Sequence, residues 1–172
     1  MHLRLICTML LLIASSDCLS QPTSPAPPST RQNEVRQKGA QVMPFALDKT
    51  VHVFDKTDSG GAQRVRVRGN APEQLAMIRS HLQDIAQAFT ARDFSQPMHI
   101  HGANMPGLSE MQAAKADELS ATYKELPDGA EILYRSRSPE IVAAIHRWFD
   151  AQLHDHGDDA TTDNVKPTVK PP

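Results

Sequence analysis

The chain has 172 residues, a formal net charge of -2 and an aromatic content of 5%. This length suits one domain with its own core, because domains usually contain about 100–150 residues. Acidic and basic residues are mixed along the chain, without a basic stripe to neutralise phosphates, and few aromatic rings are available to stack on bases, so the composition argues against nucleic acid as a partner.

The N-terminus has the pattern of a signal peptide. A polar and basic start that includes Arg4 precedes the apolar run Leu5–Ala14, which is too short for a permanent membrane span. We predict a signal peptide over residues 1–20, cleaved after Ser20, with Ala14-Ser15-Ser16 as an alternative site. The mature protein is then exported, to the periplasm or outside the cell, and has no membrane span.

Both cysteines, Cys7 and Cys18, lie within this predicted signal peptide. Cys18 is a possible site for a lipid anchor, but Asp17 and Ser15 before it fit a lipobox poorly and argue against one. Cleavage after Ser20 leaves a mature chain without thiols, which excludes disulfides, thiolate metal sites and cysteine nucleophiles.

The rest of the chain divides into three segments by composition. Residues 21–41 are rich in proline, serine, threonine and glutamine, which predicts a disordered leader. Residues 157–172 are rich in aspartate, lysine and proline, which predicts a disordered tail. A single domain of about a hundred residues is therefore expected over residues 42–156.

Apolar and polar residues alternate in four segments, as is typical of β-strands. Turn sequences rich in Asp, Pro and Gly join these segments in pairs, which predicts two hairpins: Thr50–Thr57 with Ala62–Arg68, and Ser120–Leu126 with Glu131–Arg137. The alternation places His52 on the same sheet face as Phe54. It also places Arg64, Arg66 and Arg68 on one face, either to bind an anion or as a charged surface that prevents edge pairing.

Helices are predicted after each hairpin. The first has Asn70 as its cap, runs to about Arg92 and carries apolar residues three and four positions apart, namely Leu75, Ile78, Leu82, Ile85 and Phe89. A loop that contains residues 98–108 comes next, followed by a short helix from about Ser109 to Leu119. The last helix has Ser138 as its cap and Pro139 in its first turn, and its predicted inner face is Val142, Ile145, Phe149 and Leu153.

The two halves match at several positions. Gly61-Ala62 corresponds to Gly129-Ala130, and Pro72-Glu73 corresponds to Pro139-Glu140, at an offset of 68 that falls to 67. This similarity predicts a duplicated ββα unit. Two such units form an α+β, two-layer sandwich in which a four-stranded antiparallel sheet has its helices on one face.

Histidine and methionine residues are the main candidates for a ligand site. Met98, His99, His101 and Met105 lie within eight residues, and imidazole with thioether is a donor mixture that suits copper, Cu(I) in particular. The predicted metal ligands are His101 and Met105, supported by His52 and His99, with His146 and His154 as outer candidates. The alternative is that these are surface histidines and that the methionines pack the loop against the sheet.

Motifs for other chemistry are missing from the sequence, which contains no Gly-rich phosphate loop, no Gly-x-Ser-x-Gly elbow and no His-Glu-x-x-His helix. We therefore expect an exported, non-enzymatic ligand-binding domain whose partner is a metal ion such as copper. The alternatives are an interaction module that docks an envelope protein and a small hydrolase that uses His and Asp.

Several segments carry a family resemblance: residues 43–45, 52–54, 100–108, 126–130 and 146–152. They resemble a family of small exported bacterial proteins with an Ile-His-Gly-x-x-Met-Pro-Gly-Leu motif, which spans Ile100–Leu108 here with Ala103 and Asn104 at its variable positions. Some members of that family carry the name aspartate carbamoyltransferase. This chain is too short for that enzyme and has no carbamoyl-phosphate motif, so the resemblance implies a domain boundary and no activity.

Overall fold

The computed structural model describes residues 28–163. Residues 1–27, with the predicted signal peptide and the start of the predicted leader, and residues 164–172 lie outside the described part. The helices are α1 (Thr30–Val42), α2 (Leu75–Thr90), α3 (Ser95–His101), α4 (Leu108–Ala113) and α5 (Pro139–His156), and the strands are β1 (Thr50–Thr57), β2 (Gly60–Val67), β3 (Ser120–Leu126), β4 (Gly129–Arg135) and β5 (Ala160–Thr161).

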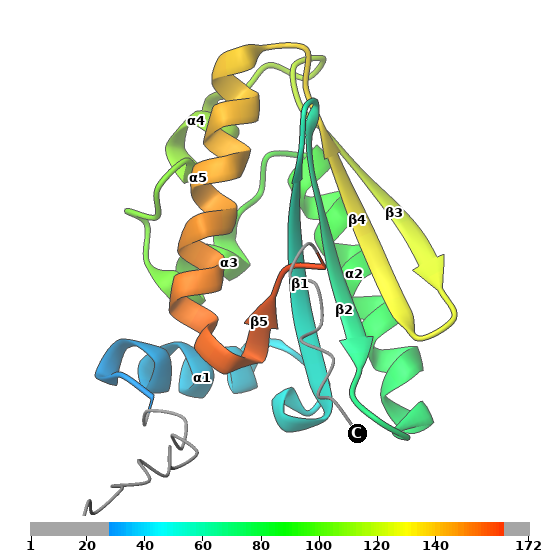
Figure 1. The fold of residues 1–172 in the computed structure, drawn as a ribbon. Helices are drawn as coiled ribbons and strands as arrows, with labels where there is room; N and C mark the ends of the chain where they lie inside the picture. The colour runs from blue at the N-terminus through cyan, green and yellow to red at the C-terminus, as the bar shows by residue number, and fades with distance from the viewer. Residues whose placement is uncertain (1–27, 164–172) are drawn as a thin grey trace, which may run out of the picture.

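The fold is α+β, with α2 and α5 packed against one face of a five-stranded sheet (Figure 1). The strand order is β3-β4-β2-β1-β5. The two predicted hairpins are present, and β2 pairs antiparallel with β4 to join them. Their turns are tighter than predicted, because β2 begins at Gly60 and β4 at Gly129. Gly129 is required there, since a Cβ atom would lie 1.9 Å from the carbonyl oxygen of Val65.

The prediction of a four-stranded antiparallel sheet is wrong. A fifth strand, β5, pairs parallel with β1 and places Ala160 and Thr161 beside His52 and Val53. These residues belong to the segment for which we predicted a disordered tail. A strand of two residues has no alternation to reveal it, and its position depends on the preceding helix, which returns the chain to the edge of the sheet. The predicted duplication is not confirmed by this arrangement and stays a prediction.

Helix α1 occupies part of the predicted disordered leader, so that prediction is wrong from Thr30 onward. The helix starts with a capping box in which Ser29 and Gln32 satisfy each other's backbone amides. Its only buried residues are Val35 and Gly39. With so small an apolar surface, the segment has no amphipathic pattern, and its order comes from tertiary contacts.

The predicted loop over residues 98–108 is partly helical. Helix α3 ends at His101 and is followed by Gly102, whose φ is 88°; α4 begins after Gly107, whose φ is 81°. At Gly107 a Cβ atom would lie 2.0 Å from the carbonyl oxygen of Ala144 on α5. Two glycines thus allow the chain to turn sharply between two short helices. The sequence pattern did not indicate this arrangement.

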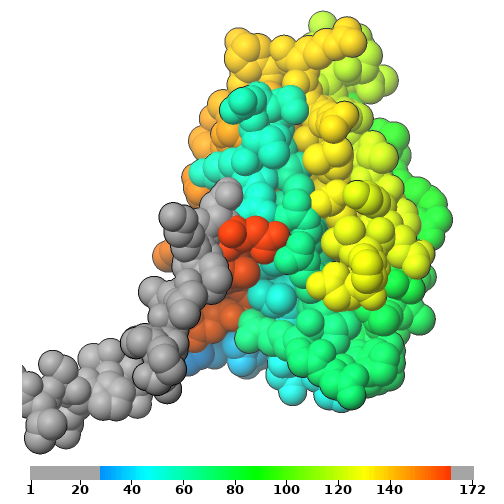
Figure 2. Space-filling model, turned by 45° about the vertical axis from the view of Figure 1, so that its right-hand side comes forward, coloured from blue at the N-terminus to red at the C-terminus, as the bar shows by residue number. Residues whose placement is uncertain are grey.

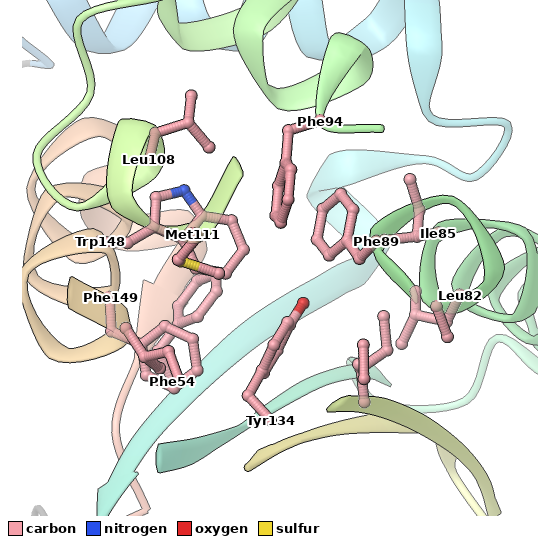
Figure 3. Close-up of a cluster of buried hydrophobic side chains, with 14 of the residues drawn as sticks. Phe54, Leu82, Ile85, Phe89, Phe94, Leu108, Met111, Tyr134, Trp148 and Phe149 are labelled. Atoms are coloured by element: carbon pink, nitrogen blue, oxygen red, sulfur yellow. The ribbon is translucent and has the colours of Figure 1, made fainter. Parts of the chain in front are cut away.

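The core lies between the sheet and the helices α2 and α5. Figure 3 shows aromatic rings from both layers meeting there, including Phe89 of α2, Tyr134 of β4 and Trp148 of α5. Four of the five predicted apolar residues of the α2 face are buried. Ser138 caps α5 as predicted, but Asn70 does not cap α2, which follows a 3-10 turn at Pro72–Gln74.

The other face of the sheet carries charged side chains, and Figure 2 shows its strands at the surface. Arg64 lies between two acidic side chains: its Nε donates to Oε2 of Glu131 at 2.7 Å, and its Nη1 donates to Asp55. Arg64 and Arg66 both also contact Asp163, at 3.2 and 3.1 Å. These ion pairs favour a charged surface over an anion-binding role for the arginines.

Candidate functional site

Three histidines from three different elements meet in the interior. His52 of β1, His101 of α3 and His156 of α5 are 4%, 6% and 9% exposed, respectively. The ring of His52 stacks on that of His156 with their centroids 4.9 Å apart, and the His101 ring meets the same His156 ring edge-on at 5.0 Å. We call these three residues the histidine cluster.

His101 is held in place by a carboxylate and an arginine. Its Nδ1 lies 2.8 Å from Oδ2 of Asp155, and Arg31 Nε donates to the other oxygen of that carboxylate at 3.0 Å. Arg31 also donates from Nη2 to the backbone carbonyl of His101 at 2.7 Å. Because the Nδ1–H of a neutral His101 donates to the carboxylate, its Nε2 has a free lone pair.

His52 has one satisfied and one unsatisfied ring nitrogen. The backbone carbonyl of Asp159 faces the ring and partly opposes the lowering of its pKa by burial, whereas Nδ1 is buried and has no hydrogen-bond partner among residues 28–163. We assign the N–H to Nε2, toward that carbonyl, which makes Nδ1 an acceptor without a donor. Buried acceptors of this kind are uncommon in proteins and point to a missing partner.

The histidine cluster is uncharged at neutral pH. Burial lowers the pKa of His52 to about 4, with a further contribution from His81. Burial also lowers the pKa of His156 well below its usual value. For His101, the effect of burial outweighs the opposing effect of Asp155, so its pKa is lowered as well. Burial alone would raise the pKa of Asp155, but hydrogen bonds from Arg31 and His101 lower it, so this carboxyl is ionised.

The histidine cluster forms part of the wall of a cavity of about 60 Å³ between the helices and the sheet. Further polar residues line it: His81, Gln63, Gln96 and Gln152. Gln63 accepts a hydrogen bond from Tyr134 Oη at 2.7 Å. Of the four buried side-chain polar atoms that lack a partner in the described part, three belong to residues that line this cavity, namely His52 Nδ1, Gln96 Oε1 and Trp148 Nε1.

Two of the six predicted metal ligands, His52 and His101, belong to this site. Met105 is buried in the hydrophobic core, and with the exposed His154 it lines a surface cleft of about 610 Å³ that His101 also borders. His99 is exposed, with Nε2 3.4 Å from Gln41 Oε1. His146 lies at the β1–β2 turn, where its Nε2 is 2.9 Å from the carbonyl oxygen of Gly60.

No three His, Cys, Asp or Glu side chains within residues 28–163 are grouped closely enough to hold a metal ion. The structure therefore brings only part of the predicted set together, and a metal would require the imidazole rings of the cluster to reorient.

Several residues of the site were not predicted. Arg31 lies in the segment assigned to the leader, and no sequence signal distinguishes it. His156 has a signal in the sequence: Phe149, Gln152 and His156 follow one another at spacings of three and four, so His156 continues the buried face of α5.

Comparisons with protein-family models, with curated proteins and with solved structures found no match for this chain. The family resemblance of the sequence motifs thus stays a prediction. Among the described helices, none has the length and apolar composition needed to cross a membrane.

Proposed function

We propose that this domain binds a small uncharged molecule in its interior cavity, against the histidine cluster. The observation that carries the proposal is the coincidence of three unsatisfied buried atoms, from His52, Gln96 and Trp148, in residues that line one cavity. Leaving a buried donor or acceptor unpaired costs about 1–3 kcal/mol. A ligand that pairs with these atoms recovers that free energy, which is the basis of both affinity and specificity.

The three atoms define the chemistry of the ligand. His52 Nδ1 and Gln96 Oε1 are acceptors and need donors, whereas Trp148 Nε1 is a donor and needs an acceptor. A primary amide carries this combination, two N–H groups and one carbonyl oxygen. The surrounding imidazoles are neutral, so a charged ligand would lose its hydration without gaining an opposite charge.

The cavity volume limits the size of the ligand. An apolar cavity of about 150 Å³ holds benzene, so the cavity here, about 60 Å³, suits a group of about two or three non-hydrogen atoms, such as the amide group of acetamide. The described residues that line it include no hydroxyl or thiol side chain. This supports binding over covalent catalysis, although Asp155 and His101 are paired as in a hydrolase.

Nuclear magnetic resonance titration of the full chain tests this proposal. Trp148 is the only tryptophan, so its indole N–H gives one assignable signal. Acetamide and urea should shift that signal saturably, whereas acetate should not. The affinity for acetamide should fall at least about fivefold in His52→Phe, because loss of one buried acceptor costs about 1–3 kcal/mol. His99→Gln, whose side chain is exposed, is the matched control. A linear, non-saturating response to acetamide contradicts the proposal.

A soft metal ion is the second candidate ligand, and one observation favours it. His52 and His101 each direct one ring N–H to an oxygen, the carbonyl of Asp159 and the carboxylate of Asp155. Metal-binding histidines are held by outer partners of this kind, which leave the other nitrogen free for the ion. Cu(I) would then bind His52, His101 and His156, without the thioether of Met105.

Titration with Cu(I), Cu(II) and Zn(II) against chelators of known affinity distinguishes the two ligands. Stoichiometric uptake that disappears in His156→Phe and persists in His146→Gln supports the metal. Affinity no higher than that of an unstructured histidine-rich peptide contradicts it.

Both ligands are consistent with export of the protein, which we propose from the signal-peptide pattern. The interaction module stays an alternative proposal, supported if an envelope protein copurifies stoichiometrically whether or not a chelator is present.

A further inference from the structure

Helix α1 lies against α3 and the last turns of α5, at the end of the molecule that holds the histidine cluster (Figure 1). A helix of this length is marginally stable on its own in water, and only Val35 and Gly39 of α1 are buried. Its position thus depends on a few side-chain contacts, most of them polar.

The first polar contact of α1 supports His101. Arg31 of α1 binds both the carboxylate of Asp155 and the backbone carbonyl of His101. The same carboxylate binds His101 Nδ1. One arginine of α1 therefore supports the group that orients one histidine of the cluster.

A second polar contact of α1 involves Asp159, which lies next to His52. Arg36 Nη2 of α1 lies 2.8 Å from Oδ2 of Asp159, and the backbone carbonyl of Asp159 accepts the hydrogen bond from His52. Between the two arginines, Gln32 Nε2 donates to the carbonyl oxygen of His154 at 3.2 Å. Asp155 and Asp159, whose oxygens face the rings of His101 and His52, thus both form ion pairs with arginines of α1.

The other end of α1 closes the cavity. Val42, its last residue, and Met43, its C-cap, both line the cavity wall. The next anchor in the core is Phe45, which is 4% exposed. If α1 detached as a unit around the segment between Val42 and Phe45, the cavity would open to solvent on that side, while the sheet, α2 and α5 would keep their packing.

We infer that α1 is a strap that controls access to the cavity and is latched by Arg31 on Asp155 and Arg36 on Asp159. This inference rests on the proposed ligand-binding function and concerns the regulation of the same site. Arg31 and Arg36 are partly solvent-exposed, at 37% and 50% of their side-chain surface. Ion pairs of this kind are weak and are screened by salt. The strap therefore opens by local unfolding, more often than the domain unfolds.

Quenching of Trp148 fluorescence in the full chain by trichloroethanol, a neutral quencher without an amide group, measures opening without the proposed ligand, because this only tryptophan lines the cavity. The quenching constant of the wild type should rise with NaCl concentration. In Arg31→Ala/Arg36→Ala it should be high already at low salt and should no longer depend on salt. Lys115→Ala/Lys124→Ala removes the same number of positive charges at exposed positions away from α1, so it is the charge-matched control and should behave like the wild type. Equal quenching constants in the wild type and the double variant, with no effect of salt on either, would overturn the inference.

Hydrogen exchange separates strap opening from general destabilisation. The amides of α1 should exchange faster in the double variant and at high salt, while those of β1 and β2 keep their protection. If the β1 and β2 amides lose protection to the same extent as α1, then α1 is not a separate unit and the inference fails. The salt series on the wild type gives this answer even if the double variant does not fold.

The association rate of acetamide then tests the link to the ligand. A faster association in the double variant than in the wild type supports the strap. Equal rates would disprove gating while leaving the binding function intact. If acetamide does not bind at all, the proposed function fails, and the quenching and exchange results still decide whether α1 opens.

Discussion

Acid should destabilise the protein well above the pH at which most of its carboxylates titrate, because the histidine cluster is buried in the neutral form. For His52, burial holds the pKa at about 4 in the folded state, against 6.5 for an exposed ring. Between these two pH values the unfolded chain binds a proton at His52 that the folded chain does not. The free energy of unfolding therefore falls as the pH decreases from about 6.5 to about 4, and the effect levels off below that range.

The size of the effect follows from the same values. The full difference between about 4 and 6.5 corresponds to about 3 kcal/mol for His52, and about 2 kcal/mol of this is already lost at about pH 5. The pKa values of His101 and His156 are lowered too, and both add to the loss.

Guanidinium chloride unfolding of the chelator-treated chain, followed by Trp148 fluorescence over this pH range, measures the loss. His156→Gln should flatten the pH dependence, whereas His99→Gln should not. A free energy of unfolding that is constant between about pH 7 and about pH 5 would refute a buried neutral cluster.

Three substitutions test the packing on which the site depends. Val35→Ala should lower the free energy of unfolding by about 2 kcal/mol in guanidinium chloride titrations, since Val35 is 1% exposed; a disordered leader would give no change. Gly107→Ala should cost about 3 kcal/mol or prevent folding, because its φ is 81° and the new Cβ would meet the backbone of Ala144; a normal thermal midpoint would contradict this geometry. Tyr134→Phe should cost about 1–2 kcal/mol by leaving Gln63 Oε1 unpaired, and an unchanged stability would show that the bond is absent.

The parts of the fold that could be predicted are those with a strong periodic pattern. The alternation around Phe54 and the turn at Pro127-Asp128 determine their hairpins locally. In α5, Ser138 gives a local start signal and the apolar spacing gives the face. By contrast, α1 and β5 are ordered by partners far away in the sequence, as the Arg31–Asp155 contact illustrates. No local pattern encodes such contacts.

The candidate site could be predicted only in part, for the same reason. His52 was placed on the correct sheet face by alternation, and His101 was selected by its neighbours in the sequence. Their meeting at His156 depends on how α5 crosses the sheet and on the end of α3 at Gly102. The cavity itself is a property of the packed layers, so that no single segment could indicate it.

A high-resolution crystal structure of the chain soaked in acetamide would test the central claim most directly. The account predicts one amide molecule in the cavity, donating to His52 Nδ1 and accepting from Trp148 Nε1. Density for ordered water alone, paired with His52, Gln96 and Trp148 under the same conditions, would contradict it and make these polar residues a solvated part of the core.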